Sequence, residues 1–166
     1  MSPVAPVPPA TVVVWIAEGT WPACVDAARA HTPVGTETVL LHVTAPDVPG
    51  AAHGAFAGLL GRGHPERDPG TRLEHLASSS AHELLRAAAD RLGRPCTTTE
   101  RTGRTEREVL AEAEASGADL LILSRDGDRT HAGPHSLGPA GRYVVDHAPC
   151  PVLLVWPEPP GAADIR

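Results

Sequence analysis

Residues 119–124, with the sequence DLLILS, form the most strand-like segment of the chain. The four consecutive aliphatic residues lack the 3.6-residue period of a surface helix, and so short a run is typical of a strand buried on both faces. Turn residues bound the run, with Ser116-Gly117 before it and a loop rich in glycine, histidine and aspartate from Arg125 to Leu137 after it. The segment therefore predicts a central strand of a parallel sheet.

The same pattern recurs outward from this strand. Apolar, β-branched runs at 11–17 (TVVVWIA), 38–43 (TVLLHV) and 151–156 (PVLLVW) predict three more strands, and 96–100 (CTTTE) predicts a weaker one. Helical patterns lie between them at 21–30, at 71–92, behind residue 105 and from 139 to 146. Near-continuous apolar strands alternating with helices predict an α/β fold, a doubly wound parallel sheet with helices on both faces.

Capping signals place the starts of three helices. Thr20 is expected to cap the first helix, while Thr71 with Glu74 and Thr105 with Glu108 have the spacing of capping boxes. We therefore expect helices to begin directly after these threonines.

The chain of 166 residues suits one domain, which we place at residues 11–156. Residues 1–10 predict a flexible, proline-rich lead, and residues 157–166 a flexible tail. Residues 45–70, rich in glycine and proline, predict a long loop excursion.

Composition excludes several classes of function. The formal charge of −6 argues against a nucleic-acid surface and against an electrostatic membrane anchor. No apolar run approaches the ~20 residues that span a bilayer, and the first ten residues lack the features of a signal peptide. Three widely spaced cysteines without a metal-type pattern predict reduced thiols, so we expect a cytoplasmic protein.

The C-terminal half carries a family resemblance. GADLLIL at 117–123, the glycine-containing loop after it, and VVDHAPCPVLLV at 144–155 resemble the universal stress protein family. The segment HAPCPVLLV at 147–155 is the most specific match, and VLLHV at 39–43 and residues 103–110 are also similar. The resemblance covers residues 11–156 apart from the excursion at 45–70.

The resemblance implies a fold and an assembly. It implies a five-stranded sheet in the order 3-2-1-4-5, in which the loops Glu18-Gly19-Thr20 and Ser124 to Gly138 face each other across a crevice. It implies a homodimer formed through the last strand, Pro151 to Trp156. Many members of the family bind ATP in the crevice, so ATP or ADP is the cofactor that the resemblance suggests.

Two positions match the nucleoside-binding residues of the family. Glu18 stands where ATP-binding members have an aspartate, and its carboxylate is one methylene longer and still able to reach a ribose hydroxyl. Val43 stands where backbone groups hold the adenine, a contact that does not depend on the side chain.

The phosphate loop departs from the family pattern, which is Gly-x2-Gly-x9-Gly-Ser/Thr. The nearest matches are Ser124, Gly127 and Gly138, followed by Pro139, with one residue too many between the two glycines. If Gly138 instead fixes the register, the first two glycines become Arg125 and Asp128. At least one glycine is lost in either register.

These replacements weaken a phosphate site, which depends on backbone N–H groups at a helix start. Pro139 supplies neither an N–H group nor a hydroxyl, although proline is also a common helix starter. Asp126 and Asp128 place carboxylates where phosphates would lie, and Arg125, Arg129 and Arg142 are available to offset them. The loop therefore predicts weak or absent ATP binding.

Other candidate sites are weaker. The nine histidines, including His53, His64 and His75, show no convergent metal spacing, so no metal is expected, while His131 and His135 lie in the crevice loop. Cys150 precedes an apolar strand and is expected to be a packed thiol rather than a nucleophile.

No catalytic residue is assigned, and three functions remain open. The first is a non-enzymatic stress-response domain that acts as a regulator through an unidentified protein partner. The second is an ATP-binding sensor of the same fold. The third, a slow ATPase or phosphoryl-transfer enzyme, lacks an evident base or lysine clamp.

Overall fold

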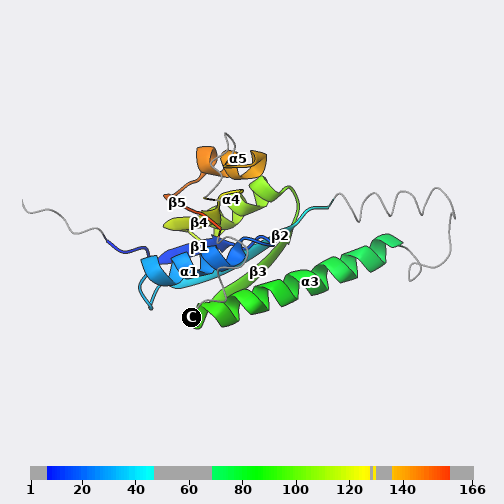
Figure 1. Ribbon diagram of the computed structural model, residues 1–166, viewed down its shortest axis with the longest axis horizontal. Helices are drawn as coiled ribbons and strands as arrows, with labels where there is room; N and C mark the ends of the chain where they lie inside the picture. Colours follow the sequence, from blue (N-terminus) through cyan, green and yellow to red (C-terminus); the bar gives the residue numbers. More distant parts are fainter. Residues whose placement is uncertain (1–6, 47–68, 128, 130–135, 158–166) are drawn as a thin grey trace, which may run out of the picture.

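The computed structural model describes residues 7–46, 69–127, 129 and 136–157 (Figure 1). Strands and helices alternate along the described chain, as the apolar runs predict. The elements are β1 (Thr11–Trp15), α1 (Trp21–His31), β2 (Glu37–Thr44), α3 (Pro69–Leu92), β3 (Thr97–Thr102), α4 (Thr105–Ala115), β4 (Leu120–Ser124), α5 (Pro139–His147) and β5 (Val152–Val155).

The five strands form one parallel sheet in the order β3-β2-β1-β4-β5, so the expected order is confirmed. Val13 of β1 pairs with Val39 of β2 on one side and with Leu121 of β4 on the other. The winding reverses between β1 and β4, and their carboxyl ends therefore open onto the place where such sheets bind ligands.

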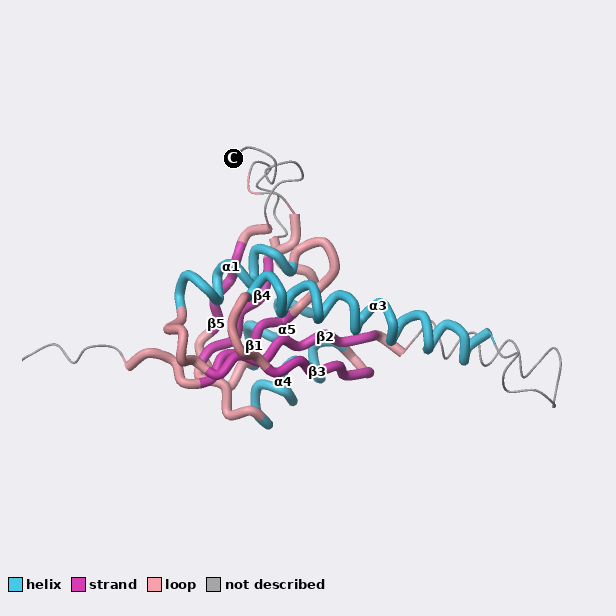
Figure 2. Tube along the Cα trace, turned by 90° about the horizontal axis from the view of Figure 1, so that it is seen from below, coloured by secondary structure: helices cyan, strands magenta, loops and turns pink. Residues whose placement is uncertain are grey.

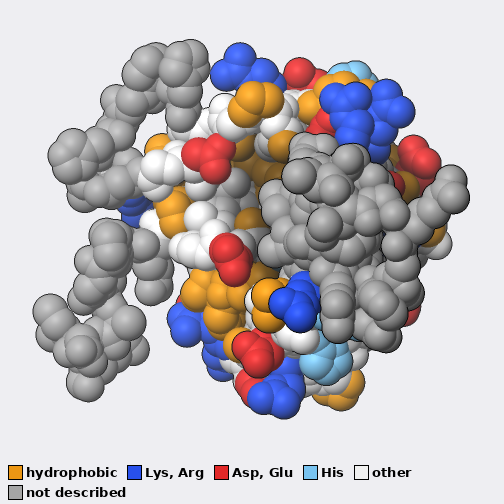
Figure 3. Space-filling model, turned by 90° about the vertical axis from the view of Figure 1, so that its right-hand side faces the viewer, with side chains coloured by type: hydrophobic (Ala, Val, Ile, Leu, Met, Phe, Trp, Pro, Cys, Tyr) orange, Lys and Arg blue, Asp and Glu red, His pale blue; other side chains and the backbone are white. Residues whose placement is uncertain are grey.

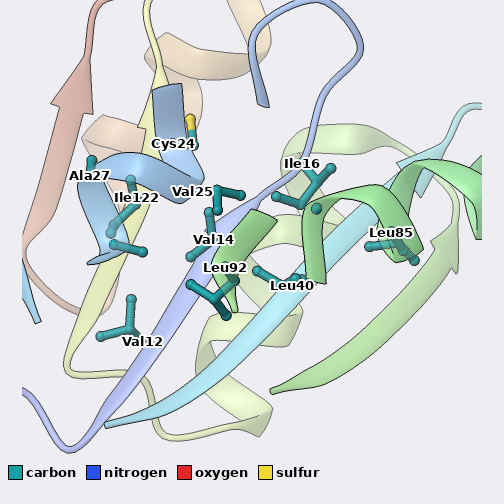
Figure 4. Close-up of a cluster of buried hydrophobic side chains, with 12 residues drawn as sticks. Val12, Val14, Ile16, Cys24, Val25, Ala27, Leu40, Leu85, Leu92 and Ile122 are labelled. Carbon is teal, nitrogen blue, oxygen red and sulfur yellow. The ribbon is translucent and has the colours of Figure 1, made fainter. Parts of the chain in front are cut away.

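Two apolar clusters cover the two faces of the sheet. Val12, Val14 and Ile16 of β1 pack with Cys24 and other residues of α1, with Leu40 of β2 and with the C-terminal half of α3 (Figure 4). Val13 points to the opposite face and joins Leu121 and Val144 under α4 and α5. Successive residues of β1 point to opposite faces of the sheet, as the two-residue period of a strand requires. Strand β1 therefore contributes to both clusters.

An acidic side chain ties β1 to β4 at the other end of the sheet. Both the Ala10 and Thr11 N–H groups donate to Oδ2 of Asp119 at 3.0 Å, and the Asp119 N–H donates to the Thr11 carbonyl at 2.8 Å. These bonds join the starts of the two central strands, at the edge of the sheet opposite the crevice.

Each of the three capping predictions is wrong in some detail. Thr20 is the N-cap of α1, but its side chain makes no capping hydrogen bond. Helix α4 begins at Thr105 itself with Arg104 as N-cap and no side-chain capping hydrogen bond, and the Glu108 carboxylate accepts from Arg101 at 3.2 Å. Helix α3 begins at Pro69, two residues before the predicted Thr71.

The N-terminal half of α3 extends past the carboxyl end of β2 (Figures 1 and 2). Its C-terminal half is anchored by Ala81, Leu85, Ala88 and Leu92, all buried, whereas Leu76 is 65% exposed. The projecting half therefore overhangs the edge of the sheet where the strands end.

The predicted lead, excursion and tail lie largely outside the described residues and stay predictions, except that Pro69 and Gly70 belong to α3. Within the described part of the chain, no helix is long and apolar enough to cross a bilayer.

Candidate functional site

A hollow of about 420 Å³ lies at the carboxyl ends of β1 and β2, under the middle of α3. Leu84 and Ala77 of α3 form one wall, and Val43 and Trp15 of the strands form another. This volume is within the range of small-molecule pockets, which combine apolar walls with a few placed polar groups. Figure 3 views the molecule from this end of the sheet. In the centre of that face, most of the side chains not covered by grey atoms are hydrophobic or uncharged.

The polar groups of this hollow come from the turn after β1, from the end of β2, from Ser80 of α3 and from Thr105 of α4. Glu18, which is exposed, contributes the carboxylate. His42 is half-buried, and its Nδ1 lies 2.8 Å from the Ile16 carbonyl oxygen. Because a carbonyl only accepts, Nδ1 carries the hydrogen and donates it, which leaves Nε2 as the second ring nitrogen. Thr44 adds a hydroxyl whose oxygen is covered and has no hydrogen-bond partner in the described part of the chain.

The start of α5 is the second half of the predicted crevice, and an acidic side chain already occupies it. The Gly138 N–H, at the N-cap position of α5, donates to Oδ2 of Asp126. A Cβ at residue 138 would lie 2.7 Å from the same oxygen, so a larger residue there would require the Asp126 side chain to move. Pro139 follows as the first residue of the helix and has no N–H to offer. The amide and the helix dipole that would attract a phosphate therefore hold a carboxylate of the chain itself.

A groove of about 700 Å³ runs from this helix start along the outer face of α5. Its lining carries Asp126 and Asp146 as acids and Arg142 as a base, together with Leu137 and Tyr143. Among the described residues, the groove and the hollow at β1 and β2 have no lining residue in common.

Arg125 is used to hold the loop after β4. Its N–H donates to the Val155 carbonyl at 2.7 Å, its guanidinium donates to Oγ of Ser136 at 2.7 Å, and the guanidinium carbon lies 5.1 Å from the centre of the Trp156 ring. A guanidinium that stacks on an aromatic ring and donates to a hydroxyl stabilises the conformation of the loop that carries it. Arg125 is therefore engaged within the protein rather than free to neutralise phosphate.

The predicted site residues fall into two groups. Glu18 and Val43 line the hollow, and Gly138 and Pro139 lie at the start of α5. Ser124 ends β4 and donates its hydroxyl to the Arg125 carbonyl at 2.9 Å, and Gly127 has a φ of +89°, a value that favours glycine. Asp128, His131 and His135 lie outside the described residues. The assignment of a nucleotide crevice to these positions stays a prediction.

Sequence reasoning missed two features of the site. The first is the polar side of β2, although the two-residue period of the strand places His42 on the face opposite Val43 and so under α3. The second is the bond from Gly138 to Asp126, which joins residues twelve positions apart through the path of a loop. No pattern in the sequence encodes that path.

The other candidates do not add chemistry to the site. Burial raises the pKa of the Cys150 thiol, and the Asp119 carboxylate raises it further, as expected for a packed thiol rather than a nucleophile. Among the residues that the structure places, no group of three or more histidine, cysteine or acidic side chains is arranged to hold a metal ion.

Comparison with known proteins agrees with this architecture. A model described as the universal stress protein family matches residues 18–155. A search of curated proteins found no match.

Several solved structures have a similar fold. The hypothetical protein MJ0577 aligns with a TM-score of 0.67 and 16% identity, over 90% of this chain and 98% of its own. A universal stress protein in complex with cAMP aligns with a TM-score of 0.57 and 19% identity, over 92% and 100%. A universal stress protein family protein from Arabidopsis thaliana with AMP bound aligns with a TM-score of 0.55 and 18% identity, over 90% of this chain and 93% of its own. At these identities the likeness shows the shared fold alone.

Proposed function

Since the chain belongs to the universal stress protein family, we propose that it is a non-enzymatic, regulatory stress-response domain in which ATP binding is weak or absent. It acts by contact with a partner protein rather than by turning over a nucleotide. Its three cysteines are unpaired, which supports a place in the reducing cytoplasm.

The observation that carries the proposal is the hydrogen bond from the Gly138 N–H to the Asp126 carboxylate. A triphosphate at this helix start would have to displace the carboxylate from the amide, and it would then face the like charge at close range. Pro139 offers no replacement donor at the next position. Asp146 of the same helix adds a second negative charge along the groove.

Titration of the purified protein tests the proposal. We expect heat-extracted protein to release no adenine nucleotide, and isothermal titration with ATP and magnesium to detect no binding up to millimolar ligand. Pro139→Ser restores an N–H and a hydroxyl to the first turn of α5, so it is expected to strengthen ATP binding. Micromolar binding of ATP to the unaltered protein would overturn the proposal.

An ATP-binding sensor of the same fold is the second candidate. It is favoured by the similar structures that carry cAMP and AMP, and by the carboxylate of Glu18 beside an apolar hollow. The same titration separates the two candidates, because a sensor must bind the nucleotide that it senses.

A further inference from the structure

The outer face of α5 carries two opposite charges on either side of an exposed tyrosine. Arg142, Tyr143 and Asp146 are all exposed, and all three line the groove along this helix. Asp146 follows the other two by four and three positions, so it lies on the same face of the helix as both. Helix α5 lies at the periphery of the molecule, on the side opposite α3, so this face looks outward (Figure 1).

Neither charged side chain of this face has a partner within the described part of the chain. Arg142 and Asp146 are four positions apart, yet they form no ion pair with each other or with another residue that the structure places. The order of the two, base before acid, is the less favourable one on a helix. Asp146 also lies in the last turn of α5, where the negative end of the helix dipole disfavours a carboxylate. The local structure therefore explains neither charge.

Tyr143 offers a preorganised apolar contact between the charges. It is 41% exposed, and its ring stacks on the ring of His147, with 4.1 Å between the centroids and 16° between the planes. Nδ1 of His147 lies 2.8 Å from the Tyr143 carbonyl oxygen and donates to it, because a carbonyl only accepts. The imidazole thus supports one face of the tyrosine ring. Exposed tyrosines that are held in place before binding are typical anchors of protein interfaces.

We propose that this face of α5 binds the same face of a second copy of the chain, with the two helices antiparallel. A two-fold axis near Tyr143 brings Arg142 of each copy beside Asp146 of the other, and it brings the two tyrosines together. The antiparallel arrangement also sets the start of one helix against the end of the other, so that the two dipoles attract. A partner with a single sign of charge would leave one of the two residues against a like charge, whereas a second copy satisfies both.

The size of the contact sets its strength. Helix α5 has 9 residues, and one face of so short a helix buries less than the ~1,600 Å² of a stable interface. The pairing is therefore weak and requires a protein concentration that approaches millimolar. It does not use β5, so it adds to the association through Pro151–Trp156 that the family resemblance implies.

Charge reversals in a Leu154→Arg background test the inference, because that background removes association through β5. Sedimentation equilibrium of the background protein is expected to show an average mass that rises from monomer toward dimer as the concentration approaches millimolar. Arg142→Asp places acids on both sides of Tyr143, and Asp146→Arg places bases there. Each single reversal makes both ion pairs of the dimer repulsive, so it is expected to weaken self-association at least tenfold.

Mixing the two single reversals separates a two-fold contact from a general effect of charge. In the mixture both ion pairs join opposite charges again, so the two variants are expected to associate with each other although neither associates alone. The double substitution Arg142→Asp with Asp146→Arg exchanges the two charges and keeps the pattern self-complementary. It is expected to associate as strongly as the background protein.

Arg107→Asp, an equal charge reversal at an exposed position of α4, is the matched control and is expected to leave the average mass unchanged. All variants are expected to share one circular dichroism spectrum, since the altered side chains are exposed. A background protein that stays monomeric near millimolar concentration would overturn the inference. So would a mixture that stays monomeric, or single reversals that associate as strongly as the background protein, and the groove would then be left to a segment of another protein.

Discussion

Cys24 shows how burial controls chemistry at a single residue. The thiol lies in the cluster between β1 and α1, with no exposed surface, and burial raises its pKa from 9.0 to about 12. Burial also raises the pKa of Cys96, although the nearby Arg94 guanidinium opposes the change. Desolvation disfavours the thiolate at each of these positions, so the folded protein keeps its cysteines in the unreactive thiol form.

The pKa of Cys24 makes stability depend on pH in the alkaline range. The unfolded chain ionises this thiol near pH 9 and the folded chain near pH 12, so its contribution is complete below pH 9 and is lost as the pH rises toward 12. Between those values the free energy of unfolding is expected to fall by about 1.4 kcal/mol per pH unit from this group. Urea unfolding at a series of pH values from 8 to 11 measures this decrease in the free energy of unfolding.

Cys24→Ala is the control for this measurement. The substitution removes the titrating thiol, so the free energy of unfolding of the variant is expected to fall less steeply over the same pH range. At pH 8 the variant is expected to be less stable than the unaltered protein, because the packing of the thiol is lost. Parallel pH profiles of the two proteins would show that the thiol ionises without unfolding.

At the scale of elements, an ion-pair cluster joins the edge strand β3 to helix α4. Nε of Arg101 donates to Oε2 of Glu112 at 2.7 Å, and Nη1 of Arg101 donates to Oε2 of Glu108 at 3.2 Å. Glu112 is buried, with 8% of its surface exposed, so Arg101 compensates for the cost of burying a carboxylate. The hydrogen bonds to Glu112 and Glu108 also raise the pKa of Arg101, which stays charged. The cluster therefore holds a polar strand that has little apolar surface of its own.

Glu112→Ala is expected to destabilise the protein by about 1–3 kcal/mol, because Arg101 loses its closest acceptor and the helix loses a packed side chain. Thermal unfolding followed by circular dichroism measures the change. Glu114→Ala, at an exposed position of the same helix, is the matched control and is expected to have the same melting temperature as the wild type. Equal effects of the two substitutions would refute a role for the cluster.

At the scale of the whole molecule, the sequence predicts the layers better than the site. Apolar runs identified four strands and the β-branched threonines of 96–100 identified the fifth, while the resemblance to the family implied the strand order. Both the apolar runs and the HAPCPVLLV segment are local signals. The contacts of Asp126 and His42 could not be predicted from neighbouring residues. The contact of Asp126 depends on the path of a loop, and the position of His42 in the hollow depends on where α3 lies. The predicted capping box at α4 did not form, and its Glu108 carboxylate accepts from Arg101 of β3 instead, a contact between elements that local spacing does not encode.

The two edges of the sheet differ in a way that bears on assembly. Strand β3 presents threonines and charged residues, which suit an edge that faces water. Strand β5 consists of Val152, Leu153, Leu154 and Val155, and all four are only partly buried. We therefore expect the protein to form a homodimer through Pro151–Trp156, as the family resemblance also implies.

Analytical ultracentrifugation measures this assembly directly. The unaltered protein is expected to sediment as a dimer, and Leu154→Arg as a monomer with the same circular dichroism spectrum. Thr98→Arg, on the exposed edge strand β3, is the matched control and is expected to remain dimeric. A monomeric wild-type protein at micromolar concentration would rule the dimer out.

The account depends most on the internal carboxylate at the start of α5, and a paired titration tests it most directly. Asp126→Ala frees the Gly138 N–H and removes one negative charge, whereas Asp146→Ala removes a charge from the same groove and leaves that hydrogen bond in place. Isothermal titration with ATP and magnesium is expected to detect at least tenfold stronger binding in Asp126→Ala than in Asp146→Ala. Equal affinities in the two variants would contradict the claim that Asp126 occupies the place of a phosphate.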